Sequence, residues 1–450
     1  MKPAVAAGHP ATAEAGAEIL AEGGTAADAV VAMALASCVA ETIMSGLLAG
    51  CHVIAFDGSR VQLLDGFGAQ PSGTGDLVEL PIAFGDEVVQ YSIGSASCAV
   101  PGLPAALGEL WERLGRLPWR RVVEPAQRLA RTGVPLPEMH GRSLEMFAGL
   151  YCLERGGDLF VRDGRILRAD ETLDQPGLVD ALEALAEEGT ASVYEGSLAE
   201  ALLSIDGVVI TADDLRDYRP RWRDPVVAPF HEYRVATRSG LSGVPELLRR
   251  MPRIAGLSPT ERVLALVAAF ESDDVGGEHT TNMAAVDAHG SACVLTHSLG
   301  VGAGVWLPGF DAQLNNLLGE SDIAVGHPQP GDRLESRMAP SLVFDGDGLA
   351  LAIGSAGATR LRTALAAVLA GILDEGLDPE AAVSRPRVHP IPGIVDAEPG
   401  VDERALDELE ERGRTVRRWE RIHHYFGGVS CVGRRGAAGD PRRNGAGIAI

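Results

Sequence analysis

The segment that most constrains the fold of this chain begins at Thr280 and reads TTNMAAVDAHGSACVLTHSL. Residues 281–286 alternate in the manner of a half-buried strand, and residues 292–299 have the composition of a returning strand. The Asp-Ala-His-Gly stretch at 287–290 supplies the residues of a turn. The segment therefore predicts a β-hairpin that starts at Thr280, with Ser298 near that start on the partner strand.

Thr280 allows two interpretations. Threonine is common in strands, so Thr280 and Thr281 taken alone are ordinary strand residues. A hydroxyl nucleophile, by contrast, needs a base beside it. If the peptide bond before Thr280 is cut, the new α-amine lies on the same residue, and its ordinary pKa of about 8 leaves a useful neutral fraction near pH 7. Such a nucleophile needs no separate Ser-His-Asp triad, and the sequence carries no recognisable signature of one.

Helix and strand patterns alternate in the first part of the chain, and residues 134–225 are mostly helical. No internal repeat and no low-complexity linker separates independent domains. A strand pair is expected at 51–66, around an Asp-Gly turn, and a single strand at 232–239. The expected helices are 11–22, a second one capped by Thr25 or Asp28 and running through Leu35, a third from Gly102 through Trp111, and 125–132, 176–189, 197–205, 211–220 and 361–373.

Charge and cysteine content argue against several classes of function. The formal net charge of −23 opposes a nucleic-acid partner, because phosphate binding needs clustered Lys and Arg. The six cysteines are scattered singly, and the His423–His424 pair has no third ligand at a suitable spacing. We therefore expect no metal and no cofactor, and we interpret the cysteines as free thiols in a reducing compartment.

The sequence predicts neither a membrane span nor a targeting segment. The most apolar stretch, residues 26–50, is interrupted by Asp28 and Glu41, so we interpret it as a buried helix that runs into a Gly-rich turn. The first residues, MKPAVAAGHPATAEAG, lack an apolar signal core. We expect a cytoplasmic protein without a membrane partner.

An ordered set of motifs resembles the γ-glutamyltransferase (γ-glutamyltranspeptidase) family. The set covers most of the chain, and its order is far more specific than any single motif. One of its members, HTTNMAAVDAHGSACVLTHSLG, contains the predicted hairpin. The matching segments are residues 8–36, 99–136, 193–203, 210–220, 279–300, 314–316, 336–344, 354–360, 385–389 and 440–445.

The resemblance implies a fold and a processing event. The fold is the four-layer αββα sandwich of N-terminal-nucleophile hydrolases, an α/β architecture. Cleavage between His279 and Thr280, by an N-to-O acyl shift, gives a large chain, 1–279, and a small chain, 280–450. The two chains together form one catalytic domain, so each chain is expected to be the partner of the other in an αβ heterodimer. A further homo-oligomer is left open.

The resemblance also implies roles for individual residues. Thr280 stands at the nucleophile position, Ser298 takes the place of a supporting hydroxyl, and Thr281 can help to position the free amine. The backbone N–H groups of Gly357 and Ala358 would hold the oxyanion just before a helix, where the helix dipole is favourable. Family members usually carry Gly-Gly here, and alanine permits a narrower range of backbone angles.

The departures from the family pattern concern the substrate. Phe67 stands where the typical enzyme has an arginine that binds the glutamyl α-carboxylate. A phenylalanine cannot form the bidentate ion pair that an arginine makes with a carboxylate. Gly300 replaces an asparagine, Leu317 a glutamine and Glu320 an aspartate. These changes remove several groups that would hold the α-amine of a glutamyl substrate.

A Ser-Ser motif and the length of one segment also differ from the family pattern. Ser336 keeps the first serine of the pair, and Arg337 replaces the second and could bind a carboxylate from another side. The chain is also short between Gly243 and Thr280, so the site is either more open or completed by another subunit. The expected substrate-binding positions are Phe67, Gly300, Glu320, Ser336 and Arg337.

Three functions follow from this mixture of kept and changed residues. The first is an autoprocessing hydrolase or acyltransferase that cleaves an amide of a small molecule through an acyl-Thr intermediate, with altered acyl specificity. The second is a C–C bond hydrolase of a natural-product pathway, of the kind that makes 4-alkyl-proline units. The third is a non-catalytic scaffold relative, against which the joint retention of Thr280, Ser298 and Gly357 argues.

Overall fold

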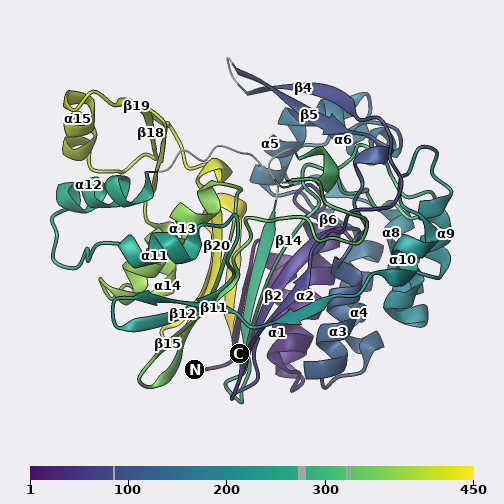
Figure 1. Cartoon of the computed structure of the whole chain (residues 1–450), viewed down its shortest axis with the longest axis horizontal. Coiled ribbons are helices and arrows are strands. Elements are labelled where there is room, and N and C mark those ends of the chain that lie inside the picture. The colour runs from purple at the N-terminus through teal and green to yellow at the C-terminus, as the bar shows by residue number, and fades with distance from the viewer. Residues whose placement is uncertain (85–86, 272–279, 321–322, 324–325) are drawn as a thin grey trace.

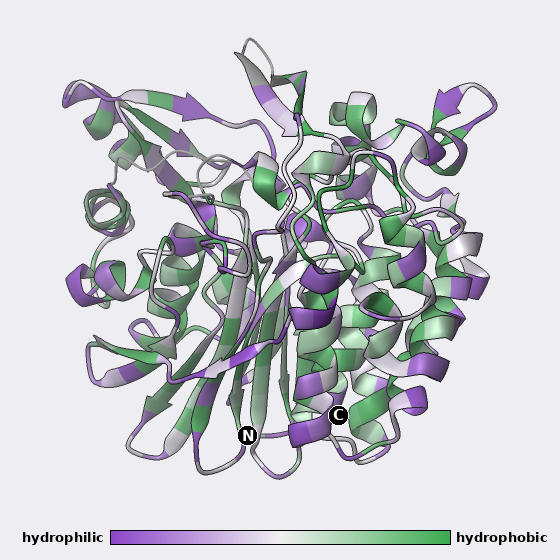
Figure 2. Cartoon of the chain, turned by 45° about the vertical axis from the view of Figure 1, so that its right-hand side comes forward, coloured by the Kyte–Doolittle hydropathy of each residue, from purple (hydrophilic) through white to green (hydrophobic). Residues whose placement is uncertain are grey.

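A computed structural model describes residues 1–84, 87–271, 280–320, 323 and 326–450. Two β-sheets lie face to face in the centre, and helices cover the outer face of each one (Figure 1). The helices are apolar on the sides that face the sheets and hydrophilic on the outside (Figure 2). This arrangement is the four-layer αββα sandwich that the sequence predicted.

The first sheet carries the predicted hairpin in its middle. In the described part of the chain its strand order is β10-β3-β2-β14-β13-β1-β22. Strands from both ends of the chain therefore meet beside the hairpin, since β1 lies between β13 and β22. The strands are β1 (Ala4–Ala7), β2 (Gly50–Phe56), β3 (Val61–Gly66), β10 (Arg221–Arg223), β13 (Thr281–Val286), β14 (Ala292–Ser298) and β22 (Ala446–Ala449).

The second sheet has the order β11-β12-β15-β16-β20-β21 among the described residues. The layer between the two sheets is filled by small and β-branched side chains, which allow the sheets to approach closely. The strands are β11 (Val226–Phe230), β12 (Tyr233–Thr237), β15 (Ser341–Asp345), β16 (Gly348–Ala356), β20 (Gly428–Gly433) and β21 (Gly436–Gly439).

Each sheet has its own helical layer. The helix α2 is buried along its whole length against β13 and β14, and a capping box between Thr25 and Asp28 begins it. On the first sheet or packed behind it lie α1 (Pro10–Ala21), α2 (Ala26–Ala40), α3 (Leu103–Leu114), α4 (Trp119–Thr132), α8 (Pro176–Glu188) and α9 (Ser197–Leu203). The other layer includes α11 (Val244–Arg250), α12 (Pro259–Phe270), α13 (Arg360–Leu373) and α14 (Pro379–Ser384).

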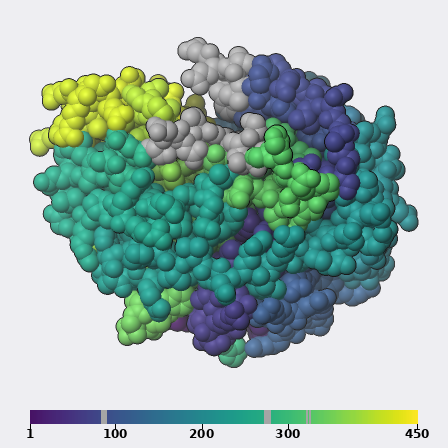
Figure 3. Space-filling view, viewed as in Figure 1, coloured from purple at the N-terminus to yellow at the C-terminus, as the bar shows by residue number. Residues whose placement is uncertain are grey.

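Smaller elements extend one end of the sandwich. A lobe lies at the upper left of Figure 1. It consists of β17 (Val388–Ile391), β18 (Ile394–Ala397), β19 (Thr415–Arg418) and α15 (Glu403–Glu411). The hairpin of β4 (Val78–Phe84) and β5 (Glu87–Ile93) stands at the upper right (Figure 3). Further helices on that side are α5 (Glu138–Met146), α6 (Ala148–Tyr151), α7 (Arg155–Phe160) and α10 (Ala212–Asp217).

The structure confirms most of the predicted elements and corrects one. The hairpin, the α2 helix and the strand pair at 51–66 lie where they were expected. The helix expected at 125–132 begins earlier, at Trp119, so Pro125 lies inside it. Proline lacks an N–H and usually marks the first turn of a helix, which is why the sequence pattern placed the start too late. None of the described helices has the length and apolar composition needed to cross a lipid bilayer.

Candidate active site

Thr280 lies at the edge of the central hairpin, one residue before β13. Only 1% of its surface is exposed, and its hydroxyl has no hydrogen-bond partner among the described residues. Its carbonyl oxygen accepts a hydrogen bond from Nη1 of Arg443, at 2.7 Å. His279, the other residue of the expected cleavage junction, lies outside the described residues. Among the residues that the structure describes, the site thus presents a buried hydroxyl without a hydrogen-bond partner.

Ser298 lies on the partner strand, across from Thr280. The register pairs Thr281 with His297, and alternation of side chains places Thr280 and Ser298 together on the face toward the second sheet. The hydroxyl oxygen of Ser298 accepts a hydrogen bond from the N–H of Gly300, at 2.9 Å. His297 points the other way, where Ser37 and Ser45 hold its ring, and burial lowers its pKa to about 3. It is therefore a neutral core residue.

Thr281 faces the helical layer instead of the space between the sheets. Its hydroxyl donates a 2.5 Å hydrogen bond to Glu41, which also accepts one from Thr12 at 2.8 Å. Glu41 ends α2 and is 1% exposed, and this burial raises the pKa of its carboxyl group. Any effect of Thr281 on the free amine must therefore act through the backbone or through Glu41. One feature of the sequence pointed to Glu41, which is an acid inside an apolar stretch.

Asn282 connects the hairpin to the second sheet. Its side chain donates to the carbonyl of Gly428 at 2.9 Å and accepts from the N–H of Ser430 at 3.0 Å. Gly428 pairs with Ala356, which immediately precedes the glycine loop at 357–358. The start of β13 is thereby fixed relative to that loop. The sequence analysis did not single out this residue, because its partners are nonlocal.

The loop at 357–358 has the geometry expected of a donor pair. Both Gly357, with φ of 118°, and Ala358, with φ of 52°, lie in the left-handed region. Within the described part of the chain neither N–H donates a hydrogen bond to a protein group. The helix α13 follows directly and adds a favourable dipole for an anion. A Cβ on Gly357 would lie 2.8 Å from Cα of Gly427, so this position requires glycine.

The left-handed conformation of Ala358 gives a testable expectation. Alanine is strained at this φ by about 1–2 kcal/mol, whereas glycine adds about 0.4–1 kcal/mol of chain entropy to the unfolded state. Ala358→Gly should therefore raise the free energy of unfolding by roughly 0.5–1 kcal/mol, as measured by urea denaturation. Ala356→Gly, two residues earlier in β16, is the matched control and should lower it. Equal losses in both variants would contradict the strain at Ala358.

Phe67 and Leu317 occupy two of the changed substrate positions, and they lie in one apolar cluster. Phe67 is 2% exposed and stacks on His52, with ring centroids 5.4 Å apart. Burial is the main cause that lowers the pKa of His52, to about 3, so its ring is neutral. The other buried members of the cluster are Ala99, Ile323, Leu334 and Met338. Both side chains therefore lie in apolar surroundings.

Gly300 and Glu320, two further expected substrate positions, lie next to each other. Gly300 has φ of 68°, and a Cβ there would collide with Asn316 and Glu320. The space of the family's asparagine side chain is thus already filled. Ser336 accepts a hydrogen bond from the N–H of Met338 at 3.1 Å, and Arg337 beside it is 5% exposed. All five expected positions are buried.

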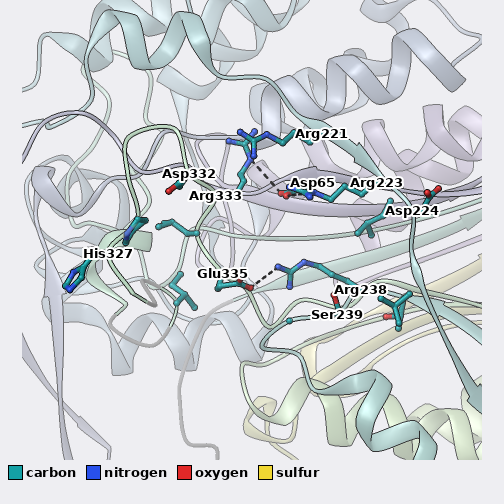
Figure 4. Close-up of a pocket in the computed structure, with 17 residues that line it drawn as sticks. Asp65, Arg221, Arg223, Asp224, Arg238, Ser239, His327, Asp332, Arg333 and Glu335 are labelled. Atoms are coloured by element: carbon teal, nitrogen blue, oxygen red, sulfur yellow. Dashed lines mark hydrogen bonds and ion pairs between the residues drawn. The ribbon is translucent and has the colours of Figure 1, made fainter.

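A cavity of about 570 Å³ opens at the edge of the two sheets, beside the apolar cluster of Phe67 and Leu317, whose members Ile323 and Leu334 line it. Asp65 lies between Arg223 and Arg333, and Arg238 pairs with Glu335 (Figure 4). Within the described residues, none of the expected site positions lines this cavity. Its charges are largely paired with one another, so the cavity does not identify the site.

Buried ion pairs hold the segment at residues 440–443, whose Arg443 bonds Thr280. Arg442 and Arg387 are both under 5% exposed, and each bonds an acid at 2.6 Å, Glu398 and Asp440 respectively. Asp440 also accepts a hydrogen bond from Arg442 at 3.2 Å. Although burial by itself raises the pKa of Asp440, the two guanidinium groups bring it below its usual value. In the sequence, Arg442 belongs only to a segment that matches the family, and no local pattern predicts its buried ion pair.

Metal ligands do not cluster in the described part of the chain. No group of three or more His, Cys, Asp or Glu there could hold a metal ion. The six cysteines are free thiols, five of them buried and Cys152 partly so. His423 accepts a hydrogen bond from the N–H of Tyr425 and packs against Trp419, so its role is structural.

Comparisons with known proteins identify relatives over the whole sandwich. The family model described as Gamma-glutamyltranspeptidase matches residues 12–251 and 258–450. An acylase ACY 1 proenzyme of Pseudomonas sp. strain V22 is 27% identical, over 95% of this chain and 89% of the relative. A glutathione hydrolase proenzyme of Pseudomonas aeruginosa is 26% identical, over 99% of this chain and 94% of the relative.

A solved structure gives the same answer for the fold. The cephalosporin acylase of Bacillus halodurans superposes with a TM-score of 0.85 at 23% identity, and covers 100% of this chain and 96% of its own. The likeness at this identity concerns the architecture and not the substrate. With a family model that spans nearly the entire sequence, the chain belongs to the gamma-glutamyltranspeptidase family and is an enzyme of the N-terminal-nucleophile amidohydrolase class.

Proposed function

We propose that this enzyme is an autoprocessing acylase that hydrolyses an amide through an acyl-Thr280 intermediate. One observation carries the proposal. The buried hydroxyl of Thr280, which bonds none of the described residues, faces the space between the sheets, and Asn282 ties its strand to the segment before Gly357 and Ala358, whose N–H groups likewise bond no described group. The relatives that cover the chain are named as an acylase proenzyme and a glutathione hydrolase proenzyme, which agrees with a self-cleaving hydrolase.

Self-cleavage would come first. The hydroxyl oxygen of Thr280 attacks the carbonyl carbon of His279, and the C–N bond breaks as its electron pair and a proton go to the Thr280 nitrogen. Water then hydrolyses the resulting ester and restores the hydroxyl group. The products are chains 1–279 and 280–450, which stay together as one catalytic domain. The step creates the α-amine that later serves as the base.

Turnover repeats the same chemistry on an external amide. The neutral α-amine takes the proton of the Thr280 hydroxyl as its oxygen attacks the substrate carbonyl. The N–H groups of Gly357 and Ala358 stabilise the oxyanion, a contribution that is typically worth about 10²–10³ in rate for each donor. The α-ammonium then gives its proton to the leaving amine, and water hydrolyses the acyl ester. Ser298 would support the hydroxyl of Thr280 from the neighbouring strand.

The acyl group would differ from γ-glutamate. An arginine and a glutamine of the family pattern are replaced by Phe67 and Leu317, which pack in the same apolar cluster. A free α-carboxylate and α-amine would lose their partners at these positions, and unpaired charges are costly to bury. An acyl chain without that amino-acid end avoids the cost. The proposed substrates are therefore amides of carboxylic acids that lack the glutamyl α-amino-carboxylate.

A series of three p-nitroanilides tests this specificity. The γ-glutamyl compound carries both α-groups, the glutaryl compound lacks the amine, and the butyryl compound lacks both. We expect kcat/KM for γ-glutamyl to lie at least about 10-fold below the better of the other two, because one unpaired buried charge costs more than 1.4 kcal/mol. A clear preference for γ-glutamyl would contradict the altered specificity.

Two further measurements separate the alternatives. Mass spectrometry of the purified protein should find chains that begin at residue 1 and at Thr280, and a β-lactone probe should label Thr280. A chain that neither splits nor reacts would instead support the scaffold alternative. A C–C bond hydrolase would label at Thr280 but would release a carboxylic acid from a keto-acid substrate and leave all three anilides intact.

A further inference from the structure

We propose that Arg443 is a positioning residue that fixes the backbone of Thr280 and lowers the proton affinity of its α-amine. The inference rests on the proposed function, because the amine exists only in the cleaved protein. An N-terminal nucleophile works near neutral pH only if its amine is unprotonated there. A buried positive charge close to the amine favours that state, since like charges repel.

The contacts of Arg443 place its charge at the nucleophile. Nη1 donates to the carbonyl oxygen of Thr280 at 2.7 Å, and it lies 3.5 Å from the sulfur of Met44. Covalent geometry then puts the guanidinium group within roughly 7 Å of the α-nitrogen of the same threonine. Nη2 lies 3.7 Å from the place where a Cβ of Gly357 would be. One side chain therefore bonds Thr280 and reaches close to the loop at 357–358.

The surroundings hold the guanidinium group in this position. Arg443 is only 4% exposed, and a Cβ on Gly428 would collide with its side chain. Burial is the main cause that lowers the pKa of Arg443, to about 10, so the group stays charged at neutral pH. A charge in a dry, fixed position acts more strongly than a solvated one.

Three acids lie in this region: Asp440, Glu41 and, beside Gly300 and Ser298, the buried Glu320. Asp440 is already engaged by Arg387 and Arg442. Glu41 accepts its hydrogen bonds from Thr12 and Thr281, and burial raises the pKa of its carboxyl group, which favours the neutral form.

The cationic neighbours point in the same direction. Arg360, at the start of α13, and Arg387 both lower the pKa of Arg443, although Arg387 is itself paired with Asp440. Because Arg443 is the charged group that bonds Thr280 itself, we expect its repulsion of an added proton to dominate at the amine. The pKa of that amine should therefore lie below the ordinary range of about 7.7–8.0.

Competitive labelling measures this quantity without any substrate. The purified, cleaved enzyme is exposed to trace acetic anhydride from pH 5 to pH 10, and mass spectrometry follows acetylation of the peptide that begins at Thr280. In the wild type we expect an amine pKa of about 7. Arg443→Met should raise it by roughly one unit, whereas Arg443→Lys, which keeps the charge, should stay within about 0.3 unit of the wild type.

The activity profile should follow the same shift. With the amine pKa raised by about one unit, the neutral fraction at pH 7 falls about fivefold, and the rate of anilide hydrolysis falls with it. At about pH 9.5 the methionine variant should approach the wild type, because the amine is then neutral in both. A purely structural loss would lower the rate equally at every pH and would leave the amine pKa unchanged.

Glu41→Gln examines the charge balance. Glutamine mimics a neutral carboxyl group, so the amine pKa should stay within about 0.3 unit of the wild type. A fall of about one unit or more would mean that Glu41 is ionised and cancels Arg443, which overturns the inference. A wild-type amine that titrates at or above the ordinary range overturns it as well, even if the methionine variant fails to fold. If no Thr280 amine is found at all, the proposed function itself fails.

Discussion

We expect the replacement of Thr280 by alanine to leave the protein as one uncut chain of 47.1 kDa and to lower the rate of anilide hydrolysis by at least about 10⁴-fold. Both losses would have the same cause, since the missing hydroxyl group is the proposed attacking group in self-cleavage and in turnover. Denaturing electrophoresis with intact-mass measurement reports the first loss, and p-nitroaniline release reports the second. The folded structure should persist, because the hydroxyl of Thr280 bonds no described residue.

Two variants at the same hairpin sharpen this result. Thr280→Ser keeps the hydroxyl group and should still split, because the attacking atom remains. Thr281→Ala removes a hydroxyl group that points at Glu41, on the other face of the strand, and should also split. If Thr280→Ala still divides before residue 280, another group cuts the chain and the proposed nucleophile is wrong.

Arg442→Met should lower the free energy of unfolding by about 3–5 kcal/mol, the second-largest effect that we expect. The arginine side chain is fully buried, and its loss leaves Glu398 without its arginine partner in a dry environment. Methionine fills similar space but offers no hydrogen-bond donor. Urea denaturation followed by circular dichroism gives the free energy, provided that the m-value is unchanged.

An exposed ion pair provides the matched control. Arg60 bonds Asp224 at 2.9 Å, yet the two side chains are 61% and 82% exposed. Arg60→Met should therefore change the free energy of unfolding by less than about 1 kcal/mol. Similar losses in the two variants would show that burial does not decide the strength of these pairs in this protein.

Local patterns predicted the central hairpin and the helix α2, whereas the resemblance to the family predicted the architecture. Alternation marked β13 and β14, and an apolar run with a capping residue marked α2. The family motifs supplied the layer order that local patterns do not contain. Pro125 was misplaced as a helix start because the packing of α4 on α2 outweighs the loss of one backbone hydrogen bond.

The environment of Thr280 was predictable only in part. The left-handed conformation at Ala358 follows from a position that is usually glycine. The contacts of Glu41 and Arg443 do not follow from the sequence, because each joins segments that are far apart along the chain. Glu41 lies 240 positions from Thr281, and Arg443 lies 163 from Thr280. Such pairings depend on how helices and sheets are stacked, which no local pattern encodes.

The strand order around β13 has a mechanical consequence for a protein cut before Thr280. β1, from the beginning of the chain, lies between β13 and β22, and β14 lies between β13 and β2. Strands of the two pieces would thus alternate across part of the first sheet. Pulling them apart would break three rows of backbone hydrogen bonds in this sheet, those of β2 with β14, β1 with β13 and β1 with β22, so cutting the peptide bond frees neither piece. Once the two pieces have been separated by denaturant, they should reassemble slowly, because β1 must insert between β13 and β22 of the other piece.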